Sequence, residues 1–167
     1  MSSDVAIRAA RESDLLQIVA LANHYILHTN AMFTTEPQTI EGRKLWFDGY
    51  GAGRYRLLVA EDATGLLGCA YSSRYRPTPA FDATVETSIY LQPDRRGAGL
   101  GARLYAALFD ILRKEDVHLA VAGVAQPNAA SNALHLKCGF EEVGTFREYA
   151  RKGNVWISST WFQKMVA

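Results

Sequence analysis

The chain has 167 residues, of which 49% are hydrophobic and 21% are charged, and its formal net charge is +1. This length fits one domain over residues 1–167 with a buried core, and the 11% of aromatic residues excludes an intrinsically disordered chain. Lysine plus arginine (18) nearly balances aspartate plus glutamate (17), so the chain has no overall charge for coating nucleic acid or a membrane. Any anion site therefore has to be local.

The cysteines and the apolar runs indicate a cytoplasmic protein. Cys69 and Cys138 form no CxxC pair, which favours a reducing compartment. The longest apolar runs are far shorter than a membrane span of about 20 residues. Residues 1–4 show no basic region leading into an apolar one, so we expect no secretory signal.

Apolar periodicity and glycine or proline breaks predict the elements in chain order. They are a strand over 5–10, helices over 13–26 and 39–50, strands over 56–61, 66–75 and 84–91, a helix over 97–114, a strand over 118–125, a helix over 128–137, and a closing hairpin over 141–149 and 154–164. This order predicts an α/β (α+β) fold, in which a mixed central sheet of about seven strands carries helices on both faces.

The strongest local signal is a glycine-rich turn between a strand and a helix. Gly97, Gly99 and Gly101 alternate there, directly after Arg95 and Arg96. Glycine lets a backbone approach a ligand closely, and the free N–H groups of a helix start favour an anion. The turn therefore predicts a diphosphate site.

Two other interpretations of this turn stay open. It can simply pack a helix tightly on a sheet. It can also be a dinucleotide site, because residues 97–102 satisfy G-x-G-x-x-G/A. That second interpretation is disfavoured, since four residues, Pro93 to Arg96, separate the turn from its strand and the next strand ends at Ala125 without a carboxylate.

Two motifs resemble the GNAT superfamily of acyl-CoA-dependent N-acyltransferases. Residues 96–101 fit its pyrophosphate motif R/Q-x-x-G-x-G/A. Asn128, Ser131, Gly139 and Phe140 fit a second motif, in which His135 takes the place of the superfamily's common tyrosine acid. Two motifs in the right order are more specific than either alone.

One branch of that superfamily is especially similar. Residues 84–91, Thr-Val-Glu-Thr-Ser-Ile-Tyr-Leu, resemble a strand of the phosphinothricin and methionine sulfoximine acetyltransferases, and that branch also carries histidine at the position of His135. The resemblance implies the GNAT fold, acetyl-CoA as cosubstrate, a homodimer, and acetylation of the α-amine of a small amino acid analogue. Antibiotic or herbicide resistance would follow from such an activity.

The resemblance implies roles for two titratable residues. Glu86 would be the general base and ammonium anchor; the alternative is a structural carboxylate paired with an arginine. His135 would share base duty or protonate the departing thiolate; the alternative is a structural histidine. A strand bulge near Ile89 and Leu91 would open the sheet for the cofactor.

The remaining site predictions divide between cofactor and acceptor. For Asn128, a helix N-cap is an equally open role. The expected cofactor-binding residues are Ile89, Tyr90, Leu91, Arg95, Arg96, Gly97, Ala98, Gly99, Leu100, Gly101, Ala102, Asn128 and Ser131. The expected acceptor-binding residues are Phe33, Thr34, Arg74, Tyr75, Arg76, Glu86, Thr87 and Ser88. Arginine forks suit the acceptor's acidic oxygens, although Arg74 and Arg76 can also be a solvated strand edge.

We expect no metal, because His24 and His28 lack a third ligand nearby. Two rival functions also fit these motifs. A protein-directed acetyltransferase of the same fold would want an open peptide groove. A non-catalytic acyl-CoA sensor would lose Glu86, which is present here. Trp46, Trp156 and Trp161 are expected in the core or in an interface rather than as platforms for a nucleotide.

Overall fold

The computed structural model describes residues 4–166. Its centre is a mixed sheet of seven strands. Residues 1–3, which entered the argument against a secretory signal, lie outside the described part. The strands are β1 (Ala6–Ala9), β2 (Leu57–Asp62), β3 (Gly65–Arg74), β4 (Thr84–Leu91), β5 (Leu119–Ala125), β6 (Glu141–Lys152) and β7 (Val155–Met165). Their order is β1-β2-β3-β4-β5-β7-β6, and only β4 and β5 pair in parallel. This confirms the predicted mixed sheet.

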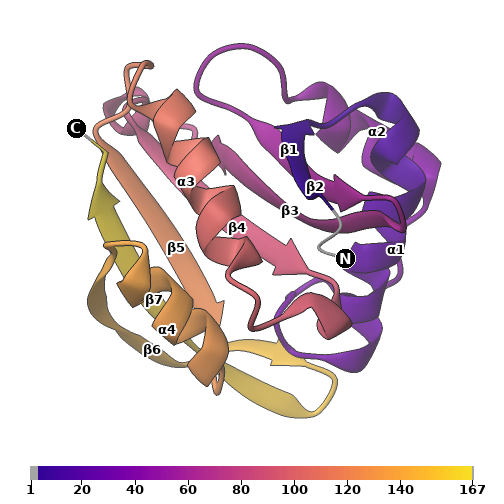
Figure 1. Ribbon diagram of the computed structural model, residues 1–167. Helices are drawn as coiled ribbons and strands as arrows, with labels where there is room; N and C mark the ends of the chain where they lie inside the picture. The colour runs from indigo at the N-terminus through magenta and orange to yellow at the C-terminus, as the bar shows by residue number, and fades with distance from the viewer. Residues whose placement is uncertain (1–3, 167) are drawn as a thin grey trace.

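Helices cover both faces of this sheet, as predicted. The helices are α1 (Leu15–His28), α2 (Ile40–Asp48), α3 (Leu100–Leu112) and α4 (Ala129–Lys137), with short 3-10 turns at Glu12–Asp14, Pro79–Phe81 and Pro93–Arg95. On one face α3 lies across the sheet (Figure 1), and its apolar stripe, including Leu104 and Leu108, is buried with Val85 and Phe162. On the other face α1 packs Ile18 and other apolar residues against β2 and β3.

Most element ends lie within two residues of the sequence prediction, and two differ by three residues, for backbone reasons. The helix expected from residue 97 begins at Leu100, because Gly97 (φ 83°) and Gly99 (φ 76°) adopt left-handed conformations that no α-helix contains. The sixth strand continues to Lys152, past an irregular register where Glu148 has a φ of 52°. A β-bulge of this kind keeps the strand paired while it turns.

Strands β4 and β5 diverge after a short parallel contact. Residues Thr84–Glu86 of β4 pair with Leu119–Val121 of β5. Beyond these residues the two strands separate: β4 remains paired with β3, and β5 remains paired with β7 (Figure 1). The β3–β4 register is unbroken from Gly68 to Leu91, so the expected bulge is absent from that ladder. The sheet opens because its two halves separate, and the opening faces residues 87–91.

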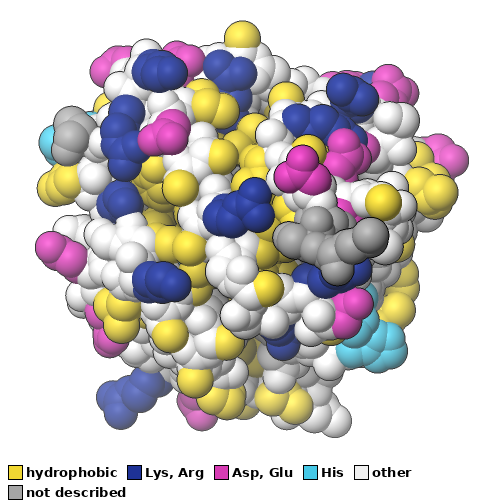
Figure 2. Space-filling model, in the orientation of Figure 1, with side chains coloured by type: hydrophobic (Ala, Val, Ile, Leu, Met, Phe, Trp, Pro, Cys, Tyr) yellow, Lys and Arg dark blue, Asp and Glu magenta, His cyan; other side chains and the backbone are white. Residues whose placement is uncertain are grey.

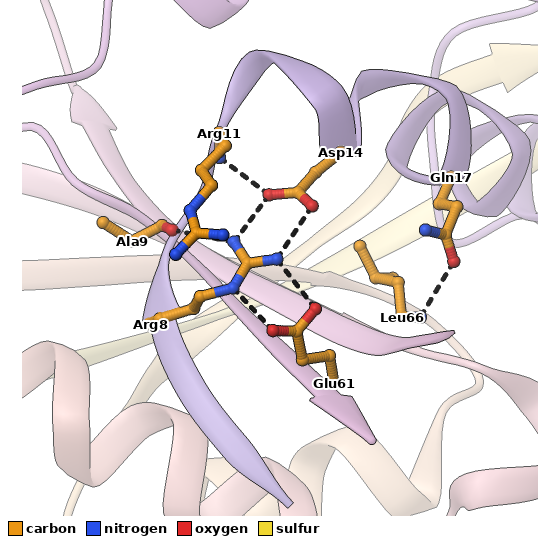
Figure 3. A network of polar contacts seen from close by, with 7 residues as sticks. All are labelled: Arg8, Ala9, Arg11, Asp14, Gln17, Glu61 and Leu66. Carbon is orange, nitrogen blue, oxygen red and sulfur yellow. Dashed lines mark hydrogen bonds and ion pairs between the residues drawn. The ribbon is translucent and has the colours of Figure 1, made fainter. Parts of the chain in front are cut away.

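An arginine ties the first strand to the first helix and to β2. The Arg8 guanidinium donates to Asp14 at 2.8 and 3.0 Å and to Glu61 at 2.7 Å twice, as Figure 3 shows. The Arg8 hydrogen bond lowers the pKa of the Asp14 carboxyl despite its burial. Beside this network, Gln17 accepts from the backbone N–H of Leu66 at 2.9 Å. These bonds set α1 in place at the end of the β2–β3 hairpin.

A second tie joins the β6–β7 hairpin to the segment after α1. The Lys152 ammonium donates to the backbone carbonyls of Ile26 at 2.5 Å, Thr29 at 2.9 Å and Met32 at 3.1 Å. In Figure 1 the tip of this hairpin lies at the lower edge of the molecule, by the loop that follows α1. The loop that continues into α2 is therefore held by a strand more than a hundred residues away.

The surface agrees with the near-zero net charge. On the face in Figure 2, basic and acidic side chains are interspersed rather than gathered by sign. No helix within residues 4–166 is long and apolar enough to cross a membrane.

Candidate functional site

A cavity of about 700 Å³ lies where β4 and β5 part. This volume lies within the range of about 300–1,000 Å³ that is usual for small-molecule sites. Its walls come from β4, the glycine-rich turn and first turn of α3, the end of β5, and α4. The predicted residues that line it are Thr87, Ser88, Ile89, Tyr90, Leu91, Arg96, Gly97, Gly99, Leu100, Gly101, Ala102, Asn128, Ser131 and His135.

The first turn of α3 presents unpaired backbone donors to this cavity. Gly99 caps the helix in a left-handed conformation, and the first intrahelical bond runs from Arg103 N–H to the Gly99 carbonyl. The N–H groups of Leu100, Gly101 and Ala102 therefore have no helical acceptor and favour an anion. A Cβ on Gly101 would lie 2.9 Å from Leu134 Cδ2, so this glycine also lets α3 approach α4.

The two neighbouring arginines point in different directions. Arg96 lines the cavity and donates to the Tyr25 hydroxyl at 3.0 Å, while that hydroxyl donates to the Leu91 carbonyl at 2.6 Å. Arg95 instead turns to the β2–β3 hairpin, where it donates to Thr64 Oγ1 at 3.2 Å. Arg95 and Ala98 do not line the cavity, contrary to the sequence prediction. A 3-10 turn at Pro93–Arg95 directs Arg95 away.

Alternation along β4 decides which backbone groups face the opening. Gln92 N–H donates to the Leu67 carbonyl at 2.8 Å, so the bonded positions toward β3 include residues 92 and 90. The N–H and C=O groups of Ile89 and Leu91 therefore point toward the gap left by β5. The Leu91 carbonyl is already engaged by Tyr25, which leaves both Ile89 groups and the Leu91 N–H.

Glu86 projects from the face of β4 opposite to Val85, which is buried against α3. Its carboxylate is half-buried and forms no hydrogen bond or ion pair with another residue of the 4–166 region, so the alternative of an arginine-paired structural carboxylate is wrong. Desolvation raises the pKa of Glu86. Glu86 is not among the residues that line the cavity, but Ser88, on the same face of β4, lines it, so the unpaired carboxylate stands beside the opening of the sheet.

His135 is a buried ring with both nitrogens engaged. It is 3% exposed and stacks on Phe162, with ring centroids 5.3 Å apart. Nδ1 lies 2.7 Å from the Ser131 carbonyl, which can only accept, so Nδ1 carries the proton. Nε2 then accepts from the Tyr105 hydroxyl at 2.9 Å. Burial lowers the pKa of His135 and favours this neutral form.

The expected shared pocket of Arg74 and Glu86 does not form. The cross-strand partner of Arg74 is Val85, which places Arg74 on the face opposite to Glu86. Arg74 instead pairs with Asp82 at 3.4 Å. The exposed Arg76 lies over the Tyr75 ring at 5.0 Å, and neither arginine lines the cavity.

An aromatic row occupies the Glu86 side of the sheet instead. Ring centroids of Tyr75 and Trp161 are 6.2 Å apart, those of Trp161 and Tyr149 are 6.4 Å apart, and those of Tyr149 and Phe33 are 6.0 Å apart. Phe33 and Thr34 are exposed and lie outside the cavity. The sequence prediction included Tyr75 and Phe33 as acceptor-binding residues but missed Tyr149 and Trp161. No local pattern tells which residues of different strands share a face of the sheet.

The second motif caps α4 and borders the cavity at once. Asn128 Oδ1 accepts from Ser131 N–H at 3.1 Å, which makes Asn128 the N-cap, and both residues line the cavity. The sequence reasoning missed Tyr105, whose hydroxyl joins the cavity wall to His135. Within residues 4–166, no group of three His, Cys, Asp or Glu side chains could hold a metal ion.

Comparisons with known proteins agree with this geometry. Residues 7–161 match the family described as Acetyltransferase (GNAT) domain. A phosphinothricin N-acetyltransferase of Streptomyces coelicolor is 45% identical over 98% of this chain and 97% of its own length. An L-methionine sulfoximine/L-methionine sulfone acetyltransferase of Pseudomonas aeruginosa is 38% identical over 95% and 92%.

Solved structures are similar over almost the whole chain. A phosphinothricin acetyltransferase of Sinorhizobium meliloti in complex with acetyl-CoA has a TM-score of 0.90 at 28% identity, over 96% of this chain and 88% of the other. A protein of Brucella melitensis named ribosomal-protein-alanine N-acetyltransferase has a TM-score of 0.91 at 34% identity, over 96% and 99%.

Proposed function

Since the chain belongs to the GNAT acetyltransferase family, we propose that it transfers the acetyl group of acetyl-CoA to the α-amine of a small amino acid analogue. Methionine sulfoximine, methionine sulfone and phosphinothricin are the leading acceptors, since the curated relatives bear these names. The observation that carries the proposal is the unpaired Glu86 carboxylate beside a cavity walled by free backbone donors.

The residues around the cavity suit acetyl-CoA. The N–H groups that begin α3, together with Arg96, would hold the diphosphate, whose charge they complement. Ile89 and the Leu91 N–H would bond the amide-bearing arm as an added half-strand. Asn128 and Ser131 would border the same arm. The cosubstrate supplies an activated acetyl group, and the chain supplies position and proton handling.

Glu86 is the proposed general base. The acceptor is an ammonium at neutral pH, so a proton must leave before nitrogen can attack the thioester carbonyl. Glu86 would take that proton, directly or through water, and its raised pKa brings it closer to the working pH. The attack forms the amide bond and breaks the carbon–sulfur bond, and the second proton that the nitrogen loses would pass to the departing thiolate, directly or through water.

His135 is proposed to act through Tyr105 rather than as a base. Its Nε2 lone pair is already occupied by the Tyr105 hydroxyl, and its Nδ1 proton is held by the Ser131 carbonyl. A neutral ring locked in this way fixes the hydroxyl in the cavity wall. It is therefore a positioning residue.

A second candidate function is acetylation of a protein N-terminus. The name of the Brucella melitensis protein favours it. The aromatic row beside Glu86 favours a small acceptor, since a peptide groove would want open polar edges. A sensor without catalysis would not keep an unpaired, half-buried carboxylate, because such burial is costly.

We further propose a cytoplasmic homodimer that confers resistance to the toxic amino acid analogues it acetylates. Five of the six large apolar side chains that are exposed on the β6–β7 hairpin lie in its central and tip region and suit an interface: Val143, Phe146, Tyr149, Val155 and Trp156. Light scattering that gives a monomer at micromolar concentration would count against the dimer.

The test of the function is turnover by Glu86→Gln across a panel of amines with acetyl-CoA. The variant keeps its size and loses the charge, so kcat should fall by about 10²-fold or more. Acetyl-CoA affinity, measured by calorimetry, should hardly change. Glu142→Gln, an exposed carboxylate on β6, is the matched control. If Glu86→Gln turns over as fast as the wild type from about pH 6 to about pH 9, Glu86 is not part of the mechanism.

A further inference from the structure

We propose that Trp161, seated over Gly123, is the wall that selects the acceptor's side chain, and that it favours an uncharged tip over an anionic one. This inference rests on the proposed function and deepens it. It assigns selectivity to a residue pair on β5 and β7, away from the cofactor motifs and from the arginines that the sequence suggested.

The strand registers place Trp161 on the same face as Glu86. Glu86 is the parallel partner of Val121, and Gly123 follows two residues later on the same face of β5. Gly123 is in turn the antiparallel partner of Trp161 on β7. Phe162, the next residue, points to the α3 face, which confirms the alternation.

Gly123 also lies at the opening of the sheet. It lines the 700 Å³ cavity, two residues beyond the last β4–β5 pair. The ring above it therefore lies on the Glu86 face of the sheet, at the edge of this opening. We infer that the non-reacting part of an amine held at Glu86 contacts this ring.

Gly123 is a glycine for space rather than for backbone conformation. It is not among the glycines with positive φ. A Cβ there would lie 2.9 Å from Cζ2 and 3.0 Å from Cε2 of Trp161, closer than side chains pack. The indole thus lies directly on the strand backbone, and any larger residue at position 123 has to displace it.

Packing alone holds the indole in this position. Its Nε1–H is buried and has no acceptor within residues 4–166. A buried donor without a partner is uncommon in folded proteins and calls for an explanation. Tyr75 and Tyr149 flank the ring edge-on, and Phe33 extends the row. The ring is tolerated here for its shape, as expected of a selectivity wall.

The chemistry of this wall favours an uncharged tip. Aromatic faces carry negative potential, so an uncharged group packs on them better than an anion does. A phosphinate placed against the Trp161 ring would lose hydration, and within residues 4–166 no guanidinium lies over that ring to compensate. The arginines on this side of the sheet lie over other rings: Arg43 over Trp46 at 3.5 Å, at the far end of β4 from Glu86, and the exposed Arg76 over Tyr75 at 5.0 Å. Methionine sulfone therefore fits the wall better than phosphinothricin.

The test measures kcat/KM with acetyl-CoA for L-methionine sulfone and for L-phosphinothricin, in four variants and the wild type. We expect the kcat/KM of the wild type to be about tenfold or more higher for methionine sulfone, because one well-placed apolar contact already gives a ratio of about ten. Trp161→Ala should lose most of this preference, and Gly123→Val should do the same by displacing the ring. Trp161→Phe should keep it within about threefold, because the ring and not the N–H selects. Met165→Ala, exposed on the same strand, is the control that should leave the ratio unchanged.

Thermal unfolding and acetyl-CoA calorimetry on each variant separate a selectivity change from misfolding. An active enzyme that prefers phosphinothricin, or whose ratio is the same in Trp161→Ala, overturns this inference and leaves the proposed function standing. A folded wild type that binds acetyl-CoA but acetylates neither amino acid overturns the proposed function itself.

Discussion

Replacing Lys152 by methionine should loosen the loop that joins α1 to α2. The substitution keeps most of the aliphatic stem and removes the ammonium, with its three bonds to the carbonyls of Ile26, Thr29 and Met32. A hydrogen bond to a charged group contributes roughly 1.5–3 kcal/mol. Desolvation lowers the pKa of Lys152 and offsets part of this, so we expect a net loss of about 2 kcal/mol for the whole cluster.

For a chain of this length, about 2 kcal/mol corresponds to a fall in Tm of roughly 4–8 °C. Calorimetry measures the fall, and Lys114→Met, an exposed lysine after α3, is the control that should stay within about 1 °C. Amide exchange should accelerate in residues 29–33 more than elsewhere, because Thr29 and its neighbours lose their anchor. An unchanged Tm together with unchanged exchange in this loop would refute the idea that Lys152 holds it.

Three other predictions follow from single contacts and pKa directions. Gly68→Ala places a Cβ 2.7 Å from the Tyr90 carbonyl oxygen, a backbone atom that cannot move aside. The free energy of unfolding, measured by thermal unfolding, should therefore fall by about 1–3 kcal/mol. In the control Gly51→Ala the new Cβ meets nothing within 4 Å, so stability should not change. Burial lowers the pKa of His135 in the folded state, so the neutral ring contributes stability above the unfolded-state pKa of 6.5, and this stability is lost as the pH falls. The Tm should therefore fall less between about pH 7 and 5 in His135→Asn than in the wild type. Equal changes of Tm with pH in the two proteins would contradict this. Burial raises the pKa of Glu86, so the acidic limb of kcat/KM should lie above the ordinary value of 4.5 and disappear in Glu86→Gln; a limb that persists there belongs to another group.

The element order and the cofactor side of the site could be predicted from the sequence because both depend on local features. Alternating apolar residues fix where strands and helices run, and the shifts at their ends came from single backbone conformations such as that of Gly99. The glycine-rich turn and the Asn128 cap depend on contacts within a few residues of the chain. Their positions along the chain were therefore enough to predict most of the residues that line the cavity, although Arg95 and Ala98 do not line it.

The acceptor side was decided by tertiary structure, because it depends on pairings between distant segments. A shift of the pairing register by one residue moves every side chain of a strand to the other face of the sheet. The β3–β4 register places Arg74 and Glu86 on opposite faces. The role of His135 likewise depends on Tyr105, thirty positions earlier in the chain, because that hydroxyl occupies Nε2. Trp161 reaches the Glu86 face only through the β5–β7 pairing, because a side chain's face is a property of the sheet and not of its own segment.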